Sequence, residues 1–66
     1  MTSDPDIFRA AKLVIDQHGE DASLHAAQRA DDLLEGGDVD GARIWHRILA
    51  AIEELRRGPK VGESIN

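Results

Sequence analysis

The chain has 66 residues, no cysteine and a formal net charge of −5 at pH 7. This length indicates a single domain, and the missing cysteines exclude disulfides and thiolate zinc sites. The acidic balance disfavours binding to nucleic acid or to anionic membrane surfaces. No apolar run is long enough to cross a membrane, and the N-terminus is acidic where a signal peptide would be basic. We therefore expect a soluble cytoplasmic protein that makes no membrane contact.

The first predicted helix covers residues 5–18. Pro5 suits the first helical position. Gly19 suits the end, because glycine takes the left-handed conformation at little cost. One apolar stripe recurs at helical spacing and is expected to face the core: Ile7, Phe8, Ala11, Val14 and Ile15.

The second predicted helix covers residues 22–35, with Asp21 as its N-terminal cap. Alanine dominates its apolar side, so we expect another helix to pack closely against it. Ala26 is expected at the edge of a buried stripe made of Leu24, Ala27, Ala30, Leu33 and Leu34.

The third predicted helix covers residues 39–57, after a turn at Gly36-Gly37 and with Asp38 as its cap. Its apolar seam comprises Trp45, Ile48, Leu49, Ile52 and Leu55, and Trp45 is expected to contribute most to the core. The prediction is an all-α fold: a compact three-helix domain over residues 1–57 with short Gly/Asp-capped turns. Residues 58–66 are expected to form a disordered tail.

The third helix has a wider apolar face than the two shorter helices can cover. Ile44, Ile52 and Leu55 are therefore expected to remain partly exposed and to form a protein interface. A small domain with an uncovered seam favours self-association, so a weak homodimer is the first partner to consider. The predicted function is that of a protein-interaction module.

The alternative is a small DNA-binding or regulatory domain. Arg43, His46 and Arg47 lie near the start of the third helix, and a basic third helix is a feature of helix-turn-helix DNA binders. The net charge argues against this function, and nucleic acid is not the expected partner. The two arginines are instead expected to face the acidic residues of the second helix.

Neither catalysis nor metal binding is expected. His18, His25 and His46 could act near neutral pH, but they lack the spacing of a zinc site. No nucleophile and base are arranged for catalysis, and three short helices rarely enclose a pocket. We therefore predict no enzymatic activity, no cofactor and no small-molecule substrate.

Residues 7–55 contain the junctions His18-Gly19-x-Asp21-Ala22 and Gly37-Asp38…Trp45. This pattern resembles a family of short, uncharacterised alphaproteobacterial proteins. The resemblance implies a small soluble cytoplasmic protein of unknown function and transfers no catalytic or ligand residue.

Arg29 is a basic residue on an otherwise acidic and small-residue helix. Two interpretations remain open. It is a functional contact in a protein interface, or it pairs with His25, with Asp32 or with a carboxylate on the first helix.

Overall fold

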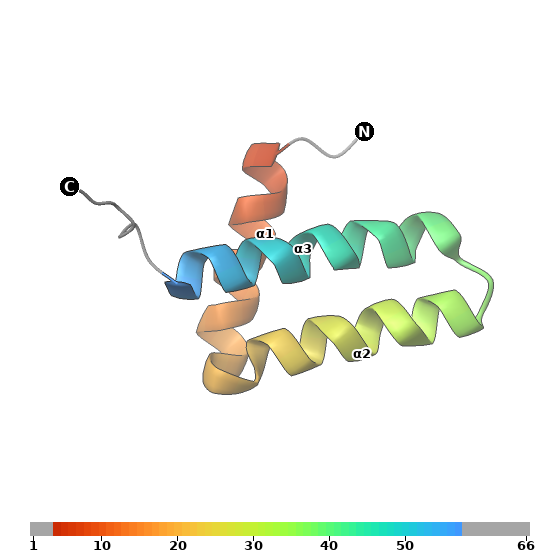
Figure 1. Ribbon diagram of the computed structural model, residues 1–66, viewed down its shortest axis with the longest axis horizontal. Helices are drawn as coiled ribbons and strands as arrows, with labels where there is room; N and C mark the ends of the chain where they lie inside the picture. The colour runs from red at the N-terminus through yellow and green to blue at the C-terminus, as the bar shows by residue number, and fades with distance from the viewer. Residues whose placement is uncertain (1–3, 58–66) are drawn as a thin grey trace.

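The computed structural model describes residues 4–57, and all its regular elements are helical. They are α1 (Asp4–His18), the short 3-10 helix η1 (Gly19–Asp21), α2 (Ala22–Glu35) and α3 (Val39–Arg57). Helices α2 and α3 lie side by side as an antiparallel hairpin, and α1 crosses the hairpin steeply (Figure 1). The all-α expectation is confirmed over this range. The expected disordered tail lies outside the described residues.

The junction between the first two helices is itself helical. Helix η1 joins α1 directly to α2, so residues 4–35 form one helical run and residues 39–57 form a second. The chain changes direction at Gly19, whose φ of 57° confirms the predicted left-handed glycine. Asp21 belongs to η1 and its side chain makes no capping hydrogen bond to α2. A cap is not needed there, because the preceding helical turn already supplies backbone acceptors.

The turn between α2 and α3 ends one helix and starts the next. The Gly37 N–H donates to the carbonyl of Leu34 at 3.0 Å, and the Asp38 N–H donates to that of Leu33 at 2.8 Å, which is a Schellman motif. Gly37 has the positive φ that this motif requires, 90°. The Asp38 carboxylate then accepts the Gly41 N–H at 2.9 Å and caps α3, as expected. A Cβ at Gly41 would lie 2.5 Å from this carboxylate, so glycine here makes room for the cap.

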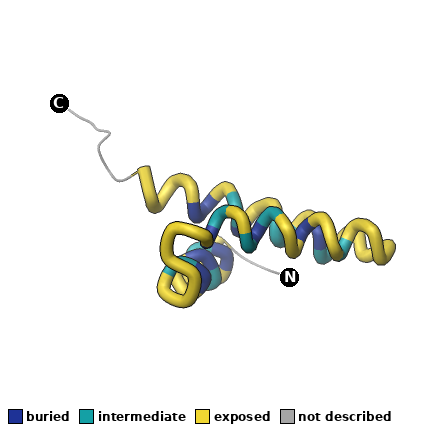
Figure 2. The backbone as a smooth tube through the Cα atoms, turned by 90° about the horizontal axis from the view of Figure 1, so that it is seen from below, coloured by how far each residue is buried: buried dark blue, intermediate teal, exposed yellow. Residues whose placement is uncertain are grey.

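The core lies where the three helices meet and consists mostly of small side chains (Figure 2). Ile52 is the largest side chain that is fully buried. Phe8, Ile15, Ile44, Trp45 and Leu49 are partly buried against this core. The buried residues are Ile7, Ala11, Val14, Ala22, Ala26, Ala30, Ala42, Ile48, Ala51 and Ile52.

The structure refines two predictions about the core. Trp45 is only partly buried against the core, and the largest fully buried side chain is that of Ile52. On α2 the buried stripe is Ala22, Ala26 and Ala30, whereas Leu24 is 57% exposed and Leu34 is 52% exposed. The reason is steric: two helix backbones approach closely only through small side chains. The larger leucines therefore lie outside the α2–α3 contact.

The hairpin is longer than the part of it that α1 covers. Figures 1 and 2 agree that its half nearest the Gly36–Asp38 turn extends beyond α1. In that half, Ala30 and Ala42 are buried, and they belong to the two helices of the hairpin itself. None of the helices within residues 4–57 is long and apolar enough to span a membrane.

Candidate interaction surface

Trp45 of α3 lies next to the imidazole of His25, which in turn stacks on that of His18. The ring of His25, on α2, is 5.8 Å from the Trp45 ring between centroids, at an interplanar angle of 80°. His25 also stacks on His18 at the end of α1, with centroids 3.9 Å apart and planes 15° from parallel. Edge-to-face and stacked arrangements are both favourable for aromatic rings. These contacts link all three α-helices.

Arg29 completes this group, which we call the Trp45 cluster: His18, His25, Arg29 and Trp45. The guanidinium Cζ of Arg29 lies 5.8 Å from the centroid of the Trp45 ring, within the range of a cation–π interaction. Arg29 and His18 are exposed, while His25 and Trp45 are half-buried. The cluster is therefore a surface feature in which an aromatic ring and a cation are held together.

Arg29 makes no ion pair with any residue of the described range 4–57. The expected alternatives, pairing with Asp32 or with a carboxylate on α1, are thus not observed there. Its guanidinium N–H groups remain available to a carboxylate from outside. A planar guanidinium held against an aromatic ring is well suited to such a bidentate contact.

The three residues predicted as an apolar interface do not form one exposed patch. Ile52 has no exposed surface, so its predicted exposure is wrong. Ile44 is half-buried against the core, and only Leu55, at 38%, is exposed. Ile52 is covered because it lies on the side of α3 that packs inward at the meeting point of the helices.

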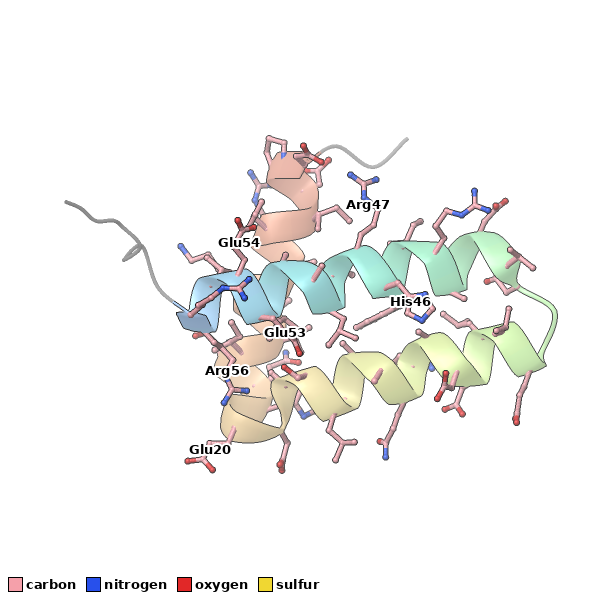
Figure 3. All side chains as sticks on the ribbon, viewed as in Figure 1. Glu20, His46, Arg47, Glu53, Glu54 and Arg56 are labelled. Carbon is pink, nitrogen blue, oxygen red and sulfur yellow. The ribbon has the colours of Figure 1, made fainter. Side chains whose placement is uncertain are left out.

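The basic residues at the start of α3 do not all lie on one side. Figure 3 shows that Arg47 points toward the N-terminal part of α1, whereas His46 points toward α2. Arg47 forms an ion pair with Asp4 at 2.6 Å, so its expected pairing with α2 is wrong. Arg43 is exposed and has no ion pair within residues 4–57. This arrangement weakens the nucleic-acid interpretation, because one of its three residues is already neutralised.

A cleft of about 220 Å³ lies between α1 and α3. It is smaller than the roughly 300–1,000 Å³ of typical small-molecule sites. The Asp4–Arg47 ion pair belongs to its lining, together with Ile7, Phe8, Ala50, Ala51 and Glu54. Over residues 4–57, no group of three or more histidine, aspartate or glutamate side chains could hold a metal ion.

A second polar contact fixes the corner where α1 meets α2. Arg56, near the end of α3, donates from Nη1 to the backbone carbonyl of Glu20 in η1 at 3.1 Å. Figure 3 shows this side chain directed toward η1. The contact holds the end of α3 against the corner.

Sequence reasoning identified the members of the cluster separately but missed their assembly. Arg29 is unusual on its helix, but the sequence does not indicate that His18, His25 and Trp45 lie beside one another. The stacking of His18 on His25 depends on the 3-10 helix η1, and the glycine at position 19 indicates a helix end there without indicating this form. Seven residues separate the two histidines, and a single continuous helix would also place them on one face but about 10 Å apart along its axis.

Comparisons of the chain with protein-family models, with curated proteins and with solved structures find no match. The geometry of the surface therefore provides the basis for a function.

Proposed function

We propose that this chain is a protein-interaction module that binds through the Trp45 cluster. The single observation that carries the proposal is the half-buried Trp45 with the Arg29 guanidinium 5.8 Å from its ring and no carboxylate paired with that guanidinium in residues 4–57. Tryptophan and arginine are the residues most enriched at the energetic centres of protein interfaces. The binding surface is thus different from the one that the apolar pattern of α3 suggested.

The pre-arranged side chains favour binding rather than catalysis. The ring contacts of His25 with Trp45 and with His18 restrict these side chains before a partner arrives. Less side-chain entropy is then lost on binding. The same proposal includes no enzymatic activity, a cytoplasmic location and membership of the alphaproteobacterial family. In it, the three α-helices act as one interaction domain.

The test is affinity capture from the native cell with three immobilised proteins: wild type, Arg29→Glu and Arg43→Glu. Both variants reverse one exposed arginine, so they change the net charge equally. We expect that one protein is captured by wild type and by Arg43→Glu. The captured amount of this protein should fall at least about tenfold with Arg29→Glu.

Two results would contradict this proposal. If Arg29→Glu captures the same proteins in the same amounts as wild type, these proteins bind a different surface of the chain. Nuclease-sensitive retention that depends on Arg43 and not on Arg29 would favour the alternative, a small DNA-binding or regulatory domain using Arg43, His46 and Arg47. Circular dichroism of each variant shows beforehand that its helices are intact.

A further inference from the structure

We propose that the partner of the Trp45 cluster is a second copy of this chain, bound with the two α2 helices antiparallel. In this arrangement Arg29 of each copy faces Asp32 of the other. The inference rests on the proposed function, since it uses the same surface, and it specifies the occupant and the register.

The first observation is the part of the hairpin that α1 leaves uncovered. The half nearest the Gly36–Asp38 turn projects beyond α1 as two helices only (Figures 1 and 2). Leu33 and Ile44 lie in this half and are only half-buried. A two-helix projection from a small domain gains stability by packing against another helical pair. A second hairpin of the same shape supplies that pair.

The second observation is the charge pattern along α2. His25, Arg29 and Asp32 are separated by four and three residues, so they lie along one side of the helix. Arg29 and Asp32 are both exposed, and neither has an ion pair within residues 4–57. This stripe therefore presents one unpaired cation, Arg29, over the Trp45 ring and one unpaired anion, Asp32, about one turn farther along α2.

A two-fold axis makes this stripe complementary to itself. In a symmetric dimer, a residue that contacts a second residue across the interface is matched by the reciprocal contact. An axis passing between positions 30 and 31 places position 29 of one antiparallel α2 level with position 32 of the other. Both cations and both carboxylates are then paired, and the Trp45 side of each copy is covered. Arg29 is the one arginine or lysine of α2, so other registers pair fewer opposite charges and are less favourable.

The experiment is a charge exchange read by sedimentation equilibrium of the full chain at micromolar to millimolar concentration. Wild type is expected to dimerise in this range. Arg29→Glu opposes two carboxylates at each contact, and Asp32→Arg opposes two guanidinium groups. Each single variant should dimerise at least about tenfold more weakly than wild type. An equimolar mixture of the two variants should form a heterodimer, because each position 29 then faces an opposite charge at position 32.

The control is Arg43→Glu, which changes the charge by the same amount as Arg29→Glu on α3 and should leave the dimer unaffected. The mixture also tests the inference if one variant is less stable. Its association requires Glu at position 29 of one copy to face Arg at position 32 of the other, in the proposed register. A wild type that stays monomeric at millimolar concentration would overturn the inference, as would a mixture that fails to associate. If Arg29-dependent capture of another protein persists in that case, the proposed function stands and only the second copy is rejected. Failure of both experiments removes both proposals.

Discussion

Ile52→Ala is expected to destabilise the chain by about 2–5 kcal/mol, the usual cost of truncating a fully buried isoleucine. Ile52 is the largest side chain with no exposed surface, and it belongs to the core formed where α1 meets the hairpin. The total stability of a domain of this length is on the order of 3–10 kcal/mol. The substitution should therefore remove a large share of the total stability and shift the midpoint of urea unfolding, followed by far-ultraviolet circular dichroism, to a clearly lower urea concentration.

Leu55→Ala is the matched control, three residues later on the same helix. Leu55 is 38% exposed, so its truncation removes less buried area and leaves no closed cavity. Its effect should be less than half that of Ile52→Ala. Equal effects would mean that the end of α3 is packed more deeply than the structure indicates.

Ala26→Leu is expected to cost about 1–3 kcal/mol, even though leucine is more hydrophobic and has a similar helix propensity. Ala26 has no exposed surface and lies between the buried Ala22 and Ala30 on α2. The three carbons that leucine adds beyond Cβ must separate the packed helices there. The melting temperature of the variant should fall accordingly.

Gln28→Leu places the same side chain at an exposed position of the same helix. Substitutions at exposed sites usually change stability by less than about 0.5 kcal/mol. A stabilising effect of Ala26→Leu would contradict the close alanine packing and support the leucine-based stripe that the sequence pattern suggested.

Helix positions could be predicted from the sequence because local chemistry sets them. Gly19, Gly37 and Asp38 act through their own backbone conformations and neighbouring N–H groups, which require no knowledge of distant contacts. The choice of buried face on α2 could not be predicted in the same way. Apolar periodicity weights leucine above alanine, whereas close helix packing selects the smaller residue, as the exposed Leu24 illustrates.

The candidate surface was predictable only in part, for a related reason. Arg29 is conspicuous in the sequence because its helix is otherwise acidic or small. Trp45 is conspicuous too, but a single tryptophan on an amphipathic helix is expected in the core. Its half-burial follows from the crossing position of α1, which covers only one half of the hairpin. That position depends on the turn through η1 and on long-range packing.

The most direct measurement of the central claim, that the Trp45 side of the hairpin is an association surface, is acrylamide quenching of tryptophan fluorescence. Trp45 is the single tryptophan in the chain, so the signal reports on this surface alone. We predict that quenching decreases as wild type is concentrated into the range where its mass increases. Arg29→Glu at the same concentrations should retain the quenching of the dilute protein. A tryptophan that remains equally accessible while the chain associates would show that another face forms the contact and would contradict the account.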